Sequence, residues 1–184
     1  MNERNNAIAL LLFALLAISA CTSSTGHQTA TNQAGGQSSY GIQKGQIPPD
    51  FIIKTIEGKE IRLSNFKENR PVLLYFWASW CPYCSQDFDV AKNVYPKYAD
   101  KVTFLAIDLD PNENAELIRK YKDRKGLNGV DFAEADTRIL SDYSVIYTTT
   151  KYAVGKSGAI VYKGSGVLSE EQWEILLNGL ATSS

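Results

Sequence analysis

The sequence has little histidine, little cysteine and no block of like charges. Its 184 residues include one histidine, His27, which lies in a polar tract, and three cysteines. A zinc site with histidine ligands and a Cys–His nucleophile pair are therefore not expected. The formal net charge is −1, so neither nucleic acid nor the charge of a membrane surface is expected as the main partner. The length suggests a single domain.

The N-terminal segment has the pattern of a secretory signal. A short polar stretch precedes the almost wholly apolar run Ala7 to Ala20, which is shorter than the about 20 residues that a membrane-spanning helix needs. The small residues Ser19 and Ala20 before Cys21 resemble the signal of bacterial lipoproteins. This resemblance implies that residues 1–20 are removed and that Cys21 is lipidated. The alternatives are an ordinary signal peptide with an incidental cysteine, or an uncleaved anchor.

The next segment, residues 21–46, is expected to hold the lipidated cysteine and a flexible tether. From Thr22 to about Gln46 the chain is rich in Ser, Thr, Gly, Gln and Ala and has almost no charge or large apolar side chains. Such a segment cannot bury enough surface to offset the entropy lost on ordering. We therefore expect residues 47–184 to form the globular domain, clear of the lipid surface.

The pattern from Ile47 onward predicts an α/β domain. Apolar runs typical of buried strands cover Val72–Trp77 and Val102–Leu109, and each is followed by a helical pattern. The helices are expected at 82–98 and 112–122, followed by a short strand near 130–132 and a helix at 136–143. Hairpins are expected around Glu57-Gly58 and around residues 155–158, and a last helix begins at Ser169, with Gln172 completing a capping box.

Two cysteines, Cys81 and Cys84, stand two residues apart at the expected strand–helix junction. Cys81 would lie at the helix N-terminus, with Pro82 at the first helical position. The unpaired amides and the helix dipole there favour a thiolate and lower the cysteine pKa from about 8.5. Cys84 is close enough in sequence to close a disulfide. The expected chemistry is thiol–disulfide exchange: Cys81 attacks a partner's disulfide, and Cys84 resolves the mixed disulfide.

Two other interpretations of this cysteine pair remain. A purely structural disulfide is compatible with an exported protein. A metal site would need more ligands than two thiols, and no histidine lies near them in the sequence. We therefore expect no metal and no cofactor.

The segment from Phe76 to Cys84, F-W-A-S-W-C-P-Y-C, resembles the active-site segment of thioredoxin-fold proteins. The hairpin expected before it, together with export, makes the chain most similar to the TlpA/ResA-type thiol–disulfide oxidoreductases. The resemblance implies a thioredoxin-like α/β fold, with a mixed central sheet, helices on both faces and an N-terminal β-hairpin. It also implies that Trp80 lies beside the nucleophile and that Pro82-Tyr83 helps to set the redox potential. The Pro-Tyr pair is also typical of glutaredoxins.

Three positions depart from the family pattern. Thr149 falls where the fold normally has a cis-proline facing the cysteines, so we expect its peptide either to be trans or to be cis and strained. Asp87, one turn after Cys84, stands where the family usually has a glutamate that assists proton transfer. The alternatives are a misaligned Thr-rich loop at Thr149 and, at Asp87, an acid favoured by the helix dipole alone. Tyr75 occupies the position of the buried aspartate of cytoplasmic thioredoxins.

The sequence therefore predicts a lipid-anchored thiol–disulfide oxidoreductase on the extracytoplasmic side of a bacterial cell envelope. The resemblance implies reduction of disulfides in exported proteins, among them apocytochromes c, with electrons from a membrane thiol donor. A disulfide oxidase or isomerase is the second interpretation. The third is a thioredoxin-fold module for binding or redox sensing with little turnover.

Overall fold

The computed structural model describes residues 39–182. The predicted signal at residues 1–20, Cys21 and residues 22–38 of the predicted tether lie outside this range. Within it, a two-stranded hairpin pairs β1 (Ile52–Lys54) with β2 (Glu60–Arg62), and a 3-10 turn (Leu63–Phe66) follows. The hairpin lies where Glu57-Gly58 predicts it.

The main sheet has five strands in the order β5-β4-β3-β6-β7. Its strands β3, β4 and β5 run parallel, whereas β6 and β7 are antiparallel to their neighbours. The sheet is therefore mixed, as the resemblance implies. The strands are β3 (Val72–Trp77), β4 (Thr103–Asp108), β5 (Asp131–Ala133), β6 (Thr150–Val154) and β7 (Ile160–Gly164).

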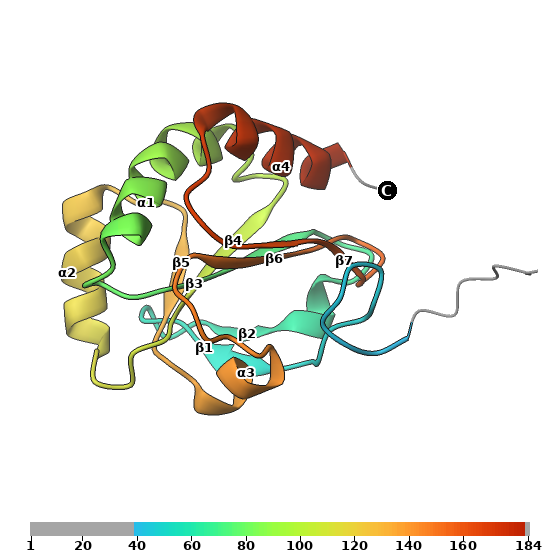
Figure 1. The fold of residues 1–184 in the computed structure, drawn as a ribbon, viewed down its shortest axis with the longest axis horizontal. Helices are drawn as coiled ribbons and strands as arrows, with labels where there is room; N and C mark the ends of the chain where they lie inside the picture. Colours follow the sequence, from blue (N-terminus) through green and yellow to red (C-terminus); the bar gives the residue numbers. More distant parts are fainter. Residues whose placement is uncertain (1–38, 183–184) are drawn as a thin grey trace, which may run out of the picture. The chain divides into compact units, whose positions relative to one another are not determined.

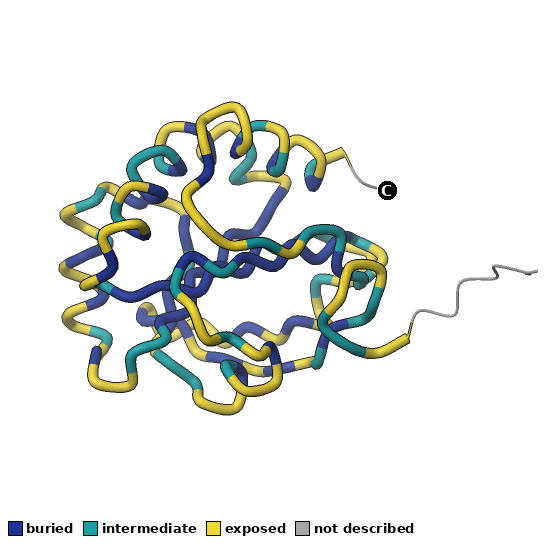
Figure 2. The backbone as a smooth tube through the Cα atoms, viewed as in Figure 1, coloured by how far each residue is buried: buried dark blue, intermediate teal, exposed yellow. Residues whose placement is uncertain are grey.

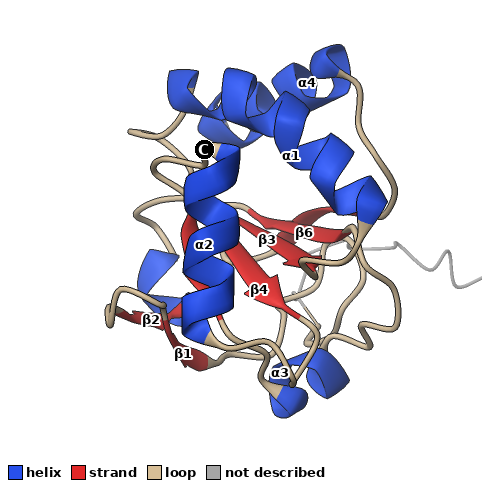
Figure 3. Ribbon diagram, turned by 90° about the vertical axis from the view of Figure 1, so that its left-hand side faces the viewer, coloured by secondary structure: helices blue, strands red, loops and turns tan. Residues whose placement is uncertain are grey.

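Four α-helices pack on the two faces of this sheet (Figures 1 and 3). The helices on one face are α1 (Pro82–Val94), α2 (Ala115–Lys125) and α4 (Glu170–Thr182). The β1–β2 hairpin and α3 (Thr137–Asp142) cover the other face. A 3-10 turn, Tyr95–Lys97, follows α1, so the α-helix ends earlier than the predicted residue 98.

The central strand β3 is buried along its whole length, as the dark blue trace at the centre of Figure 2 shows. Its side chains alternate between the two faces. Leu73, Tyr75 and Trp77 join the apolar cluster under α1, α2 and α4, and the other three join the cluster under the hairpin and α3. The apolar run therefore predicts the strand correctly because both faces of the sheet are covered.

The helix boundaries follow local capping chemistry. Asn114 caps α2 by accepting a hydrogen bond from the N–H of Leu117 at 3.0 Å. The helix therefore begins at Ala115, later than the predicted Asn112. At α4, Ser169 and Gln172 form the predicted capping box through two reciprocal hydrogen bonds of 2.8 and 3.2 Å.

The last residues of the predicted tether make backbone hydrogen bonds to the domain. The N–H of Gly45 donates to the carbonyl of Ile160 on β7 at 2.8 Å, and the N–H of Ile160 donates to Gln46 at 2.8 Å. The N–H of Ile47 also donates to Ser39 at 3.0 Å. Backbone hydrogen bonds need no apolar side chains, so composition did not reveal this contact.

Candidate active site

The two cysteines lie where the chain leaves β3 and enters α1. Cys81 is the N-cap of α1, with extended backbone angles (φ −79°, ψ 112°), and Pro82 occupies the first turn. The Sγ atom of Cys81 accepts a hydrogen bond from the backbone N–H of Cys84 at 3.0 Å. A disulfide joins the two residues, whose Cα atoms are 5.3 Å apart. The structure therefore shows the oxidised form of this pair.

The start of α1 favours a negative sulfur on Cys81. First-turn amides lack partners within the helix, and the positive end of the helix dipole points toward this position. The first turn of α1 carries no acidic side chain. Cys81 keeps 2% of its surface exposed, whereas Cys84 is fully buried. Cys81 is therefore suited to attack an external disulfide, and Cys84 is suited to attack Cys81.

The residues around Cys81 include two exposed aromatic side chains. Trp80 and Tyr83 are 61% and 62% exposed, and Pro82 is exposed as well. The indole Nε1 of Trp80 donates a hydrogen bond to Asp110 at 2.8 Å. Trp80 is therefore fixed in position although its ring faces solvent.

Two carboxyl groups lie behind the segment that leads to Cys81. Glu113 accepts hydrogen bonds from the hydroxyl of Ser79 at 2.6 Å and from its N–H at 3.1 Å. Asp108, at the end of β4, is fully buried. Burial, followed by the neighbouring Glu113 carboxyl, raises the pKa of Asp108 to about 8. Asp108 is therefore mainly protonated at neutral pH.

This raised pKa predicts that stability depends on pH. Folded Asp108 keeps its proton up to about pH 8, whereas an unfolded aspartate loses its proton near pH 4. Between these values the folded state binds more protons, so the free energy of unfolding falls as pH rises and levels off above pH 8. We expect Asp108→Asn to remove this loss. At pH 9 its free energy of unfolding should exceed that of the wild type by about 2 kcal/mol or more, which corresponds to roughly 4–8 °C in Tm.

Thermal unfolding of the oxidised protein at pH 5 and pH 9 tests this prediction. The matched control is Glu116→Gln on α2, where the replaced carboxylate is 73% exposed, and its Tm should differ from that of the wild type by the same small amount at both pH values. An Asp108→Asn gain of equal size at pH 5 and pH 9 would show that the carboxyl does not titrate in this window.

Asp87 is fully buried one turn after Cys84. Its Oδ1 atom accepts hydrogen bonds from the indole of Trp173 at 2.7 Å and from the N–H of Leu168 at 3.1 Å. Its Oδ2 atom lies 2.5 Å from the Nζ atom of Lys151. The helix dipole alone does not account for a carboxylate with three buried partners.

Lys151 is a residue of this site that the sequence analysis did not identify. It lies on β6, is fully buried, and its Nζ atom is 4.7 Å from the ring centroid of Tyr75. Burial lowers the pKa of Lys151, and the charge of Asp87 opposes this shift. Burial, and then Asp87, raise the pKa of Tyr75 well above its usual value, so Tyr75 stays neutral. The available signal was a lysine at the start of one strand of the second predicted hairpin, directly before the apolar run Tyr152 to Val154.

Thr149 directly precedes β6. Within residues 39–182 every peptide bond is trans, so the trans alternative is the one observed, and Thr149 has a φ of 64°. This left-handed conformation is uncommon for a β-branched residue. Thr150 pairs with Phe76 near the end of β3. Thr149 therefore lies beside the C-terminal end of β3, from which the chain runs to Cys81.

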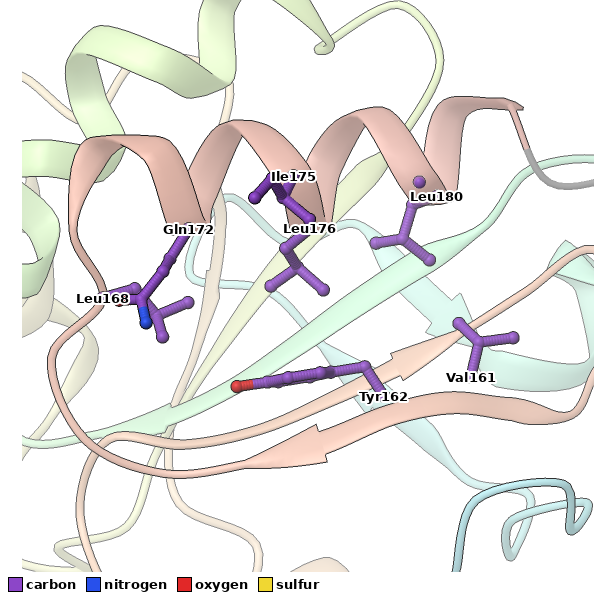
Figure 4. A pocket seen from close by; sticks show the side chains of 8 residues that line it. Val161, Tyr162, Leu168, Gln172, Ile175, Leu176 and Leu180 are labelled. Atoms are coloured by element: carbon purple, nitrogen blue, oxygen red, sulfur yellow. The ribbon is translucent and has the colours of Figure 1, made fainter.

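An apolar groove of about 400 Å³ lies between α4 and β7 (Figure 4). None of the predicted site residues lines it. We therefore assign the groove no role in the exchange chemistry. Its lining includes Val161, Tyr162, Leu168, Ile175, Leu176 and Leu180.

Two features are absent from the described part of the chain. Among residues 39–182, no three His, Cys, Asp or Glu side chains are grouped so that they could hold a metal ion. No helix in this range is long and apolar enough to cross a membrane. Cys21, the predicted lipidation site, lies outside these residues.

Comparison with known proteins identifies a family and related sequences. The AhpC/TSA family matches residues 45–167. The thiol-disulfide oxidoreductase ResA of Bacillus cereus is 32% identical over 134 residues, which cover 72% of this chain and 76% of ResA. The thioredoxin-like protein YneN of Bacillus subtilis is 31% identical over 143 residues, covering 77% of this chain and 83% of YneN.

Solved structures share the fold. StoA from Bacillus subtilis superposes with a TM-score of 0.58 at 26% identity, covering 70% of this chain and 96% of StoA. A secreted disulfide oxidoreductase from Mycobacterium tuberculosis has a TM-score of 0.61 at 20% identity, covering 71% of this chain and 96% of that protein. The hairpin, the mixed sheet and the helix that begins at the cysteines therefore form a thioredoxin-like domain.

Proposed function

Because this chain belongs to the AhpC/TSA family of thioredoxin-like proteins and is a thiol–disulfide oxidoreductase, we propose that it reduces disulfides of exported proteins on the extracytoplasmic side of a bacterial membrane. The observation that carries the proposal is the Cys81–Cys84 disulfide at the N-terminus of α1. Cys81 is the nucleophile, Cys84 is the resolving residue, and Trp80, Pro82, Tyr83, Asp87 and Thr149 support them.

The cycle transfers two electrons and needs no cofactor. In the reduced protein, the Cys81 thiolate attacks one sulfur of the substrate disulfide, a mixed disulfide forms, and the other substrate sulfur leaves as a thiolate. The Cys84 thiolate then attacks Cys81, which closes the Cys81–Cys84 disulfide and releases the second substrate thiolate. Both substrate thiolates take protons from solvent or from nearby groups. A dithiol donor in the membrane reduces the disulfide again by the same exchange.

The surface near the cysteines supports a protein substrate. Trp80 and Tyr83 flank Cys81 in the chain. Both carry large aromatic side chains, which are 61% and 62% exposed. Exposed aromatic groups beside a reactive centre suit an apolar polypeptide segment better than a small polar thiol.

The direction of electron flow separates this proposal from the oxidase interpretation. In growing cells, a reductase should be present mainly as the Cys81/Cys84 dithiol and an oxidase mainly as the disulfide. Acid quenching followed by thiol alkylation and gel mobility measures this ratio. A largely oxidised pair would contradict the reductase proposal and favour the oxidase.

Anchoring through Cys21 gives a separate prediction. We expect Cys21→Ser to release most of the protein from the membrane fraction, or to leave the uncleaved precursor, because the lipid attachment atom is lost. Membrane sedimentation followed by immunoblotting measures both outcomes. The matched control, Cys81→Ser, removes a thiol of the active site and should leave membrane attachment intact. Processed protein of Cys21→Ser that stays on the membrane would contradict lipid anchoring at this residue.

A further inference from the structure

The ammonium group of Lys151 joins two parts of the site that are distant in sequence. Its Nζ atom lies 2.5 Å from Oδ2 of Asp87. It also donates hydrogen bonds to the carbonyls of Gly166 at 2.7 Å and Thr149 at 3.2 Å. The contact with Asp87 is an ion pair, and the two carbonyls are the hydrogen-bond acceptors of the ammonium group.

One of these parts is the turn of α1 that follows Cys84. Asp87 belongs to this turn, and its carboxylate accepts hydrogen bonds from Trp173 and Leu168 and forms an ion pair with Lys151. These three partners come from α4, from the segment before α4 and from β6. Asp87 therefore links α1 to the C-terminal part of the domain, with Lys151 supplying the opposite charge.

The other part is the backbone around Thr149. A threonine with a φ of 64° is strained, and this conformation persists only where the surrounding structure holds it. The hydroxyl of Thr149 accepts a hydrogen bond from the N–H of Gly166 at 2.9 Å, and the carbonyl of Thr149 accepts from Lys151. Three hydrogen bonds among Thr149, Lys151 and Gly166 therefore fix a segment that carries no proline.

Titratable groups from several elements surround the Lys151–Asp87 ion pair. Tyr75 faces the ammonium group from β3, and the charge of Asp87 acts on Tyr162 of β7. The indole of Trp173 on α4 is neutral, and its ring centroid is 5.6 Å from Nζ. Asp87 is the one anionic group in contact with the ammonium among the described residues, so the two charges are matched.

We propose that Lys151 is a positioning residue for disulfide exchange, which holds the Thr149 segment in a fixed place relative to the cysteine-bearing end of α1. This inference rests on the proposed function. Exchange needs the attacking, central and leaving sulfurs close to a line, so a small displacement of the bound chain slows it strongly. Lys151 therefore acts through Thr149 and Asp87 and does not touch the reacting sulfurs.

The test uses variants that lose the same charges but differ in hydrogen-bond donors. Asp87→Asn combined with Lys151→Met, and Asp87→Asn combined with Lys151→Gln, both remove the ion pair without leaving one buried charge alone. Only the glutamine can still donate to the carbonyls of Thr149 and Gly166. With the full-length protein in detergent and a disulfide-bonded peptide as substrate, we expect kcat/KM to fall at least tenfold further in the methionine variant, mainly through a higher KM.

Hydrogen exchange of the Gly166 amide, which donates to the hydroxyl of Thr149, provides a second readout. This amide should stay protected in Asp87→Asn, which keeps the lysine, and lose protection in any variant without a donor at residue 151. Equal kcat/KM in the two double variants, or lost activity with unchanged exchange in the double variant that carries Lys151→Met, would overturn the inference. A wild-type protein that reduces no disulfide would instead defeat the proposed function.

Discussion

Replacing Cys81 by serine is expected to lower disulfide reduction by about a thousandfold or more. A serine hydroxyl is not ionised at neutral pH and does not exchange with a disulfide, so both steps of the cycle lose their nucleophile. The fold should change little, because the N-cap position also suits serine. Reduction of insulin disulfides by the full-length protein in detergent, with dithiothreitol as donor, measures the loss.

The control for this experiment is the third cysteine. Cys21→Ser keeps Cys81 and Cys84 and should reduce insulin at the wild-type rate. If Cys81→Ser instead retained a tenth or more of the wild-type rate, the reaction would not depend on the predicted nucleophile. Equally slow reduction by the wild type and by Cys81→Ser would favour the third interpretation, a binding or sensing module.

Removing the resolving thiol is expected to trap the substrate. In Cys84→Ala, Cys81 can still attack a disulfide, but no second thiol is placed to release the partner. Mixed disulfides should therefore accumulate from an undetectable level to a substantial fraction of the protein. Non-reducing electrophoresis of cells quenched with acid shows them, and mass spectrometry of the adducts identifies the exported substrates.

The matched control for the trap removes both thiols. Cells with Cys81→Ser and Cys84→Ala together should show no adducts, because the attacking sulfur is absent. Adducts that persist in this double variant would have to pass through Cys21. Their presence would contradict the assignment of exchange chemistry to Cys81.

The sequence predicted the parts of the fold that depend on local chemistry. The run from Val72 to Trp77 is apolar because both faces of β3 are covered, and Pro82 after Cys81 suits the first position of a helix. Ser169 and Gln172 predicted the cap of α4 because a capping box involves only near neighbours. Composition did not predict the backbone hydrogen bond that Gly45 donates to Ile160, because Ile160 lies on a strand far along the chain.

The site was predictable in its cysteines and not in its buried charges. The spacing of Cys81 and Cys84 places both at one helix terminus, so the closeness of the two sulfurs follows directly from the sequence. The partners of Asp87 come from residues that are far along the chain, Lys151 and Trp173. Nothing local to Asp87 indicates them. The hydrogen bond between Ser79 and Glu113 was not predictable either, because it depends on how β4 lies beside β3.

The most direct test of the central claim is the rate at which each cysteine of the reduced protein reacts with iodoacetamide as pH varies. Peptide mass spectrometry assigns the label to Cys81 or Cys84. A thiolate stabilised at the start of α1 should make Cys81 react first, with a pKa clearly below the usual value of about 8.5, while buried Cys84 reacts slowly. Equal reactivity of the two thiols with ordinary pKa values, or faster labelling of Cys84, would contradict the account.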